Sequence, residues 1–151
     1  MSEAQAAQLG HRLLASGLAA DPAFLLARAR AVTSSAANAR LAPLGLKVRS
    51  MSVLWLAAQG LGPSQRELSE FLGLDPSQVV SLVDDLQQRG LVERRPDERD
   101  RRSRIIVATA EGQRLLGEAL VVARAAGDAC FAKLTDHERT TLSELLLKVA
   151  F

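Results

Sequence analysis

The side chains best suited to chemistry in this sequence are arginines gathered between positions 89 and 104. They outnumber the acids of the same stretch by seven to four, although the whole chain carries a formal net charge of only +2. The arginines are Arg89, Arg94, Arg95, Arg99, Arg101, Arg102 and Arg104, and the acids are Glu93, Asp97, Glu98 and Asp100. Guanidinium groups pair well with phosphate oxygens. The cluster therefore indicates one localised contact with a polyanion rather than a uniformly cationic surface.

Two short helices precede the arginines and are separated by a very short turn. The first is predicted from the capping box Ser64–Glu67, in which a serine is followed three residues later by a glutamate. Its apolar side, which we expect to be buried, consists of Leu68, Phe71 and Leu72. Gly73 ends this helix, and one residue separates Gly73 from Asp75, the predicted N-cap of the second helix. So short a turn makes the helices cross steeply, as in a helix–turn–helix.

The second helix, predicted over residues 76–89, has two distinct faces at 100° per residue. Its apolar face consists of Val79, Leu82, Val83 and Leu86, and its polar face of Ser77, Gln78, Ser81, Asp84, Asp85 and Gln88. Strand-like residues 91–95 and 104–108 follow, joined by the polar loop 96–103. A helix–turn–helix with a charged hairpin behind it is the order of a winged helix–turn–helix, which inserts a helix into the major groove of DNA and lays a wing beside it.

The rest of the chain is predicted to be helical, over residues 4–20, 23–42, 48–59 and 110–133. The capping box Thr135–Glu138 opens a last helix, whose apolar stripe consists of Leu142, Leu145, Leu146 and Val149. The predicted fold is mainly α with a small β-hairpin wing, in one compact domain. Residues 47–108 form the winged helix–turn–helix, and residues 1–46 with 109–151 form a helical dimerisation region.

Several other classes of protein find little support. Cys130 is the only cysteine, so no disulfide joins two parts of the chain, and no apolar run or leader-like start suggests a membrane or secretion. We therefore expect a cytoplasmic protein. Neither a nucleophile–base pair nor a phosphate-binding glycine loop appears, so we expect no enzyme and no cofactor. His11 and His137 are isolated, so no metal site is predicted.

The run LGLDPSQVVSLVDDLQQRGLVERRPDERDRRSRIIVATAEG resembles the MarR family of bacterial transcriptional regulators, and the resemblance extends over roughly residues 23–150. Its most specific block is Gly90–Gly112, with GLVERRP, the Asp100-Arg101-Arg102 triplet and the Thr-Ala-Glu-Gly helix start in register. The resemblance implies an obligate homodimer that binds a palindromic operator in double-stranded DNA. It also implies a repressor that a small aromatic or phenolic effector releases.

Ser77, Gln78 and Ser81 are the candidates for contact with base edges in the major groove. Glutamine can bond adenine with two hydrogen bonds, and serine accepts either partner. The alternative is an ordinary solvated helix face. Many family members carry a basic residue at the position of Ser81 or Asp85, and this helix has none before Arg89. We therefore expect fewer base contacts, or contacts through water, and expect Asp84 to pair with an arginine of its own chain.

The wing is the second candidate, and its alternative interpretation is a self-neutralising cluster of charges. In the family, the acid matching Asp100 holds the wing while the arginine matching Arg102 enters the minor groove, with Arg101 close behind. Phosphate contacts are predicted for two sets of residues, since these contacts give affinity without sequence choice. One set is Arg94, Arg95 and Arg99, and the other is Gln65 and Arg66 at a helix N-terminus.

Three questions remain open from the sequence. A winged helix can also serve as a protein-interaction module without an operator, although the basic wing favours DNA. Cys130 can be a redox sensor or a small buried apolar residue, and the absence of tyrosine favours the second. The resemblance implies an effector pocket near residues 31–40, 53–55 and 115–119, but no ligand-binding residue is identified.

Overall fold

The computed structural model describes residues 12–98, 100 and 102–151, and the chain divides into two compact units, Met1–Ser35 and Ala36–Phe151. In the first unit, the 3-10 helix η1 (Gly17–Ala20) precedes the helix α2 (Pro22–Leu41), which continues into the second unit. The Oδ2 atom of Asp21 accepts a hydrogen bond from the backbone N–H of Phe24 at 2.7 Å. An aspartate that satisfies a free N–H of the first turn, with proline after it, is a typical helix start.

The predicted amphipathic helix over residues 4–20 is wrong for the part that the structure describes. Residues 4–11 lie outside the described residues. Beyond them, residues 12–13 are helical, a turn follows, and η1 completes the segment. The hydroxyl of Ser16 donates to the carbonyl of Leu13 at 2.7 Å, and Gly17 follows directly. A serine that bonds a nearby carbonyl, next to a glycine, favours a turn over continued helix.

The second unit contains a helix–turn–helix, a two-stranded hairpin and two C-terminal helices, which confirms the predicted fold class. Its elements are η2 (Ala42–Leu44), α3 (Val48–Ala58), α4 (Gln65–Leu72), α5 (Pro76–Gln88), β1 (Val92–Pro96), β2 (Arg104–Ala108), α6 (Ala110–Cys130) and α7 (Asp136–Ala150). Three of the helices are capped by the predicted residues, namely Ser64, Asp75 and Thr135. Only α6 ends clearly earlier than predicted, at Cys130 instead of about residue 133.

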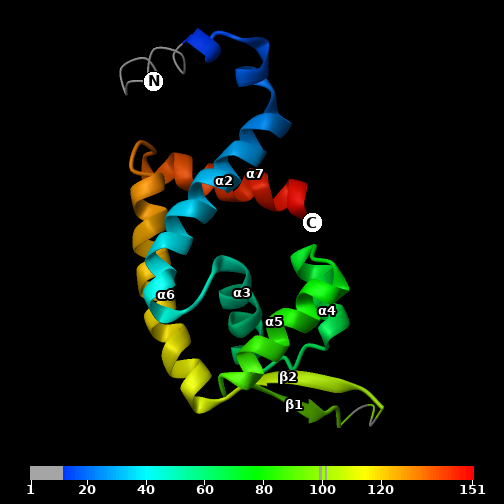
Figure 1. Ribbon diagram of the computed structural model, residues 1–151. Helices are drawn as coiled ribbons and strands as arrows, with labels where there is room; N and C mark the ends of the chain where they lie inside the picture. The colour runs from blue at the N-terminus through cyan, green and yellow to red at the C-terminus, as the bar shows by residue number, and fades with distance from the viewer. Residues whose placement is uncertain (1–11, 99, 101) are drawn as a thin grey trace. The chain divides into compact units, whose positions relative to one another are not determined.

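β1 and β2 form an antiparallel hairpin whose strands extend away from the helices (Figure 1). Val92 lies opposite Ala108 at the base, and Pro96 lies opposite Arg104 near the loop. The base is also attached to α4, because the N–H of Ile106 donates to the carbonyl of Pro63 at 2.8 Å. Since Pro63 directly precedes the N-cap of α4, the wing and the first helix of the helix–turn–helix share one anchor.

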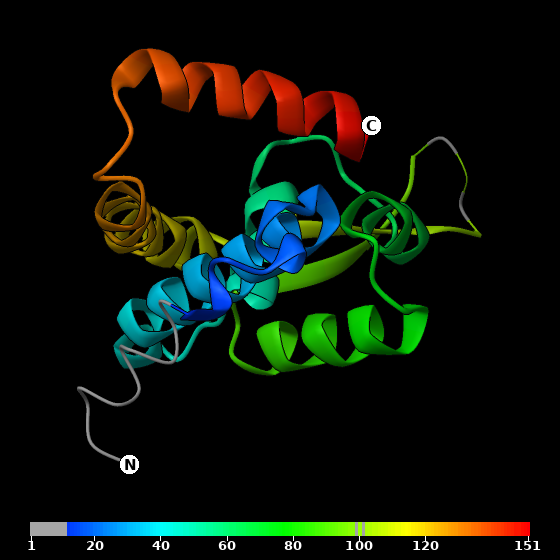
Figure 2. The same ribbon diagram turned by 90° about the horizontal axis from the view of Figure 1, so that it is seen from above.

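The core of the second unit lies between α3, α4, α5, the hairpin and the first half of α6. Its fully buried large side chains are Leu41, Leu46, Val53, Leu54, Leu68, Val79, Val83, Leu86, Val92 and Ile106. α5 contributes the predicted apolar face to this core, with Leu82 half-buried at its margin. The opposite face of α5 is therefore left to solvent, and Figure 2 shows α5 (green) on the outer side of the unit, away from α7 (red).

The prediction that Phe71 is buried in the core is wrong. Leu68 is fully buried and Leu72 is half-buried, but the side chain of Phe71 is 57% exposed. Its ring stacks on that of Phe151, with the centroids 5.2 Å apart. At 100° per residue, Phe71 lies about 60° from Leu68 around the helix, at the edge of the apolar arc. Periodicity identified the correct side of α4 but not where the cover of the core ends.

The start of α6 is packed tightly against the end of the helix–turn–helix. Thr109 caps α6 by accepting from the N–H of Gly112 at 3.0 Å, while its own hydroxyl donates to the carbonyl of Gly90 at 2.7 Å. A Cβ atom on Gly112 would lie 2.0 Å from the carbonyl oxygen of Leu91. Only glycine fits there, which explains why the helix start Thr-Ala-Glu-Gly follows the hairpin.

α7 differs from the other long helices because none of its residues, all of which the structure describes, is buried. Leu145 is 55% exposed and Val149 is 74% exposed. Among the described residues, no single helix is long and apolar enough to cross a membrane. One bent pair, Pro22–Leu44 with Val48–Ala58, passes by length and composition alone, as core helices of soluble proteins also do.

Candidate nucleic-acid interface

The turn between α4 and α5 fixes the crossing of the two helices. Gly73 adopts the left-handed conformation, with φ of 59°, and so ends α4. The N–H of Leu74 then donates to the carbonyl of Ser69 at 3.1 Å. In return, the hydroxyl of the buried Ser69 donates to the carbonyl of Leu74 at 2.7 Å. This pair of reciprocal hydrogen bonds holds α5 at a defined angle to α4.

Asp75 organises the N-terminus of α5. Its Oδ1 atom accepts hydrogen bonds from the backbone N–H of Ser77 at 2.8 Å and from the hydroxyl of Ser77 at 2.5 Å. These bonds favour the ionised carboxylate, the one to the Ser77 hydroxyl most, and they lower the pKa of Asp75 below its ordinary value. The N-terminus of α5 therefore begins with a cap whose carboxylate is held in one orientation by Ser77.

The three predicted base-reading residues all lie on the exposed face of α5. Ser77, Gln78 and Ser81 are exposed, and the hydroxyl of Ser81 donates to the carbonyl of Ser77 at 3.0 Å. The hydroxyls of Ser77 and Ser81 thus donate to acceptors of the same chain, and their oxygens can still accept a hydrogen bond. Val80, which is 41% exposed, lies outside this face, since at 100° per residue it is about 160° around the helix from Gln78.

The expected pairing of Asp84 with an arginine of its own chain is present, and the partner is Arg94 of β1. The Nη2 atom of Arg94 donates to Oδ1 of Asp84 at 2.5 Å, and Nη1 donates to Oε1 of Gln87 at 2.7 Å. Its Nε atom donates to Oε1 of Gln65, the first residue of α4, at 2.9 Å. Two predicted phosphate contacts, Gln65 and Arg94, are therefore bonded to each other.

The side chains of Arg66 and Arg95 are more exposed to solvent than that of Arg94. The Nε atom of Arg66 donates to Oε1 of Glu70 at 2.8 Å, which is an exposed pair one turn apart on α4. The Nε atom of Arg95 donates to Oε1 of Glu93 at 2.8 Å on the same strand. Such exposed ion pairs are weak and exchange readily for another anion. Both guanidinium groups therefore remain available for phosphate.

The loop of the wing is folded by Asp100. Its carboxylate accepts from the backbone N–H of Arg102 at 3.0 Å and from the hydroxyl of Ser103 at 2.9 Å. The N–H of Ser103 also donates to the backbone carbonyl of Asp100 at 2.9 Å. An aspartate that bonds the backbone two residues ahead is a common turn device. It leaves the Arg102 side chain exposed. Arg99 and Arg101 lie outside the described residues.

Arg89, at the end of α5, has a role that sequence reasoning did not find. Its Nη1 atom donates to the carbonyl of Gly45 at 2.7 Å, and Nη2 donates to the carbonyl of Leu44 at 3.1 Å. Gly45 ends η2 in the left-handed conformation. Two carbonyls left free at the end of a short helix attract a cation. Arg89 thus attaches α5 to the segment between α2 and α3, which is 44 residues away in sequence.

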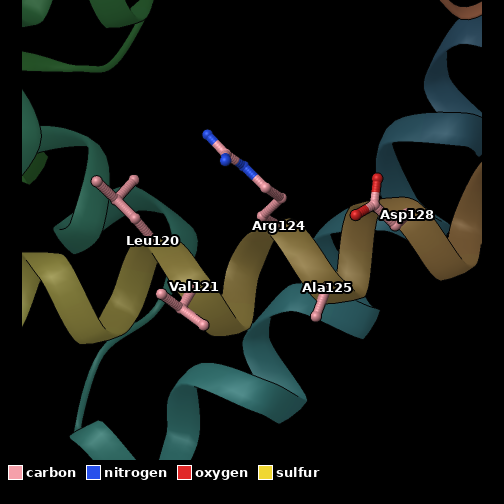
Figure 3. A pocket seen from close by; sticks show the side chains of 5 residues that line it. All are labelled: Leu120, Val121, Arg124, Ala125 and Asp128. Atoms are coloured by element: carbon pink, nitrogen blue, oxygen red, sulfur yellow. The ribbon is translucent and has the colours of Figure 1, made fainter.

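The second half of α6 borders an open depression of about 340 Å³. Its lining residues are Leu120, Val121, Arg124, Ala125 and Asp128, and the Arg124 side chain extends outward from the helix between Leu120 and Asp128 (Figure 3). The depression lies just beyond residues 115–119, where the resemblance implied part of an effector pocket. Cys130, expected to be buried, is only half-buried. No group of three or more His, Cys, Asp or Glu side chains suited to a metal ion occurs among residues 12–98, 100 and 102–151.

Comparison with known proteins gives consistent matches over most of the chain. The model of the MarR family matches residues 44–103. The HTH-type transcriptional repressor Rv2887 of Mycobacterium tuberculosis is 31% identical over 135 residues, which cover 88% of this chain and 97% of that protein. Several of the similar proteins are named as transcriptional regulators or repressors.

Two solved structures bring ligands into the comparison. The structure of CouR from Rhodococcus jostii RHA1 bound to p-coumaroyl-CoA superposes with a TM-score of 0.83 at 43% identity, over 91% of this chain and 96% of that one. The structure of Rv2887 in complex with p-aminosalicylic acid superposes with a TM-score of 0.72 at 28% identity, over 87% of this chain and 99% of that one.

Proposed function

The chain belongs to the MarR family of transcriptional regulators, and from this premise we propose that it is a cytoplasmic repressor that binds a palindromic operator in double-stranded DNA as a homodimer. One observation carries the proposal. The outer face of α5, which the core leaves free, lies beside a wing whose loop is folded by Asp100 so that Arg102 is exposed. A helix for the major groove and an arginine for the adjacent minor groove are the two parts of winged-helix recognition.

Within this interface, we assign separate tasks to the helix and the wing. Ser77, Gln78 and Ser81 contact base edges and supply sequence preference. Arg102, with Arg101 next to it in sequence, enters the narrow minor groove, where the negative potential is strongest. Because α5 carries no basic residue between Pro76 and Gln88, the wing supplies most of the electrostatic affinity.

Arg66 and Arg95 bind phosphates beside this site. Arg66 pairs with Glu70, whose side chain is 64% exposed, and Arg95 pairs with Glu93, whose side chain is 45% exposed. Such exposed pairs are weak, so a DNA phosphate can replace either glutamate. Phosphate contacts of this kind fix the register of the protein on the duplex without reading its sequence.

Pairing of two chains would place two α5 helices in successive major grooves, with half-site centres about one helical turn, roughly 34 Å, apart. The exposed apolar side chains of α7, including Leu145 and Val149, support such pairing. In this assignment residues 47–108 bind DNA, and residues 1–46 with 109–151 hold the two chains together.

Release from DNA would follow from binding of a small aromatic or phenolic acid, or its thioester. The support is similarity, since CouR is bound to p-coumaroyl-CoA and Rv2887 to p-aminosalicylic acid in their structures. A ligand that prefers a dimer whose α5 helices no longer match two successive grooves shifts the population away from the DNA-binding form.

A mobility-shift titration with duplexes from the DNA beside the protein's own gene tests the proposal. The expected result is a shift that weakens steeply as salt rises, because each phosphate contact releases a counterion. The rival function, a winged helix used only for contact with proteins, predicts no salt-sensitive shift with any fragment. Addition of p-coumaroyl-CoA or salicylate to the bound complex then tests release.

A further inference from the structure

We propose that Arg94 is a positioning residue that sets the angle of the wing relative to α5, and that it does not bind DNA phosphate. This inference rests on the proposed DNA-binding function, because the angle matters only if the helix and the wing must meet one duplex together. It departs from the sequence-based expectation that Arg94 and Gln65 each bind a phosphate.

The side chain of Arg94 joins three elements at once. It starts from β1 and donates to Gln65 of α4 and to Asp84 and Gln87 of α5, at distances between 2.5 and 2.9 Å. All three of its nitrogen atoms are therefore occupied by acceptors of the same chain. The side chain is also only 25% exposed. A guanidinium held in this way has a fixed orientation, since its planar donors match three acceptors simultaneously.

The backbone of Arg94 is fixed as well. In the hairpin it lies opposite Ile106, which is fully buried and whose N–H donates to Pro63. Arg94 is thus the position at which the wing leaves the body of the fold. The loop lies roughly five residues beyond it, on the order of 15 Å at the rise of a β-strand. A tilt of about 10° at Arg94 would move the loop by about 3 Å, the length of one hydrogen bond.

Neutralising Asp84 gives the positioning role a direct test. A role of charge alone and a role in holding Arg94 predict changes of opposite sign in the affinity for DNA. If only charge mattered, removing an acid from the DNA-facing helix would strengthen binding to a polyanion and free Arg94 for phosphate. If Asp84 holds Arg94, the same change loosens the wing and weakens binding. Asp85 is the matched control, since it is the adjacent acid of α5, its side chain is similarly exposed, and its nearest cation is Arg89 at 3.6 Å.

The experiment measures affinity for a labelled duplex by fluorescence anisotropy for the wild type, Asp84→Asn, Asp85→Asn and Arg94→Lys. We expect Asp84→Asn to weaken binding about fivefold and Arg94→Lys about tenfold, since lysine cannot bond three acceptors in one plane. Asp85→Asn should leave affinity unchanged or raise it about twofold. Equal strengthening by both Asp→Asn changes, or full affinity in Arg94→Lys, would overturn the inference.

A second readout requires no DNA and separates this inference from the proposed function. Hydrogen–deuterium exchange of the free protein should be faster at the amides of residues 92–95 in Asp84→Asn and Arg94→Lys, and unchanged in Asp85→Asn. If the wild type binds no duplex, the proposed function fails, whereas the exchange data still decide whether Arg94 positions the wing. Exchange that is the same in all four proteins would overturn the positioning role.

Discussion

α5 and α7 are both amphipathic helices, of 13 and 15 residues, but they satisfy their apolar faces differently. α5 buries Val79, Val83 and Leu86 completely in the core of its own chain. α7, described over its whole length, buries none of its residues and leaves Leu145 and Val149 exposed. Exposed apolar stripes of this size are typical of interaction surfaces. The contrast supports the proposal that the reading module, residues 47–108, is complete within one chain and that α7 contributes to the interface of the proposed dimer.

The largest effect that we predict is a loss of stability where α6 packs against the winged helix–turn–helix. Gly112→Ala should destabilise the fold by roughly 3 kcal/mol or more, because a Cβ atom would lie 2.0 Å from the carbonyl oxygen of Leu91. Gly117→Ala is the control on the same helix, since no described atom lies within 4 Å of its Cβ position apart from its chain neighbours and the nearby backbone of α6. It should be neutral or stabilising by up to about 1 kcal/mol. Urea denaturation measures both, and similar stability of the two variants would contradict the packing described for α6.

The next prediction separates the interface from the module. Leu145→Glu combined with Val149→Glu should weaken self-association at least about a hundredfold, since burial of each such side chain contributes roughly 1.5–3 kcal/mol. The folded module should persist, because neither residue belongs to its core. Sedimentation velocity measures association, and circular dichroism measures folding.

Thr140→Glu introduces a single negative charge on the opposite side of α7, at an exposed position, and should leave association intact. If the double variant remains associated, or if it unfolds, α7 is not the separable interface that the contrast with α5 suggests.

Within the module, a third prediction compares the wing with the reading helix. Arg102→Ala should weaken binding to every duplex with a narrow minor groove, because a minor-groove arginine responds to shape. Gln78→Ala should instead change the preference among duplexes, by about 1–3 kcal/mol at the affected base pair. Titration of a set of duplexes with single base-pair changes measures both. An equal loss of affinity on all sequences in Gln78→Ala would remove it from the base-reading set.

The sequence predicted local features of the module more reliably than its long-range contacts. The caps Ser64, Asp75 and Thr135 were predictable because a cap bonds residues two or three positions away. The bond between Gln65 and Arg94 joins residues 29 positions apart, so local pattern gave no indication of it. Charge alone suggested a partner for Asp84 without saying which arginine it would be.

Burial was predicted well only where an element is covered on all sides of its apolar face. Three of the four apolar-face residues of α5 are buried and Leu82 is half-buried, but Phe71 of α4 and Leu145 and Val149 of α7 are exposed. Periodicity states which side of a helix is apolar, and it does not state whether this chain covers that side. The same limit applies to function, since the roles of two predicted DNA contacts, Gln65 and Arg94, depend on which acceptors the fold places beside Arg94.

The smallest effects that we predict concern the two N-caps, Asp75 of α5 and Thr135 with Glu138 of α7. Hydrogen bonds to Ser77 lower the pKa of Asp75, and hydrogen bonds to the backbone and side chain of Thr135 lower that of Glu138. A lowered folded-state pKa means that the stabilisation is complete above the ordinary carboxyl pKa, about 4, and is lost as the pH falls through the folded-state value.

Asp75→Asn and Glu138→Gln should therefore each reduce the loss of stability between about pH 5 and pH 3 slightly. Thermal unfolding followed across this range measures the effect. Only α7 is proposed to lie at the interface. The difference between α5 and α7 would therefore be supported further if Glu138→Gln, but not Asp75→Asn, changed how self-association depends on pH in the acid range. A steeper acid response in either variant would contradict the assigned direction of the pKa shifts.

The central claim is that the module is complete in one chain but acts in pairs on DNA. The most direct test is sedimentation of the protein with a duplex from the DNA beside its own gene, at salt between about 50 and 200 mM. We predict a complex of two chains per duplex whose affinity falls steeply over this range. A complex with one chain per duplex, or no complex at any salt concentration, would contradict it.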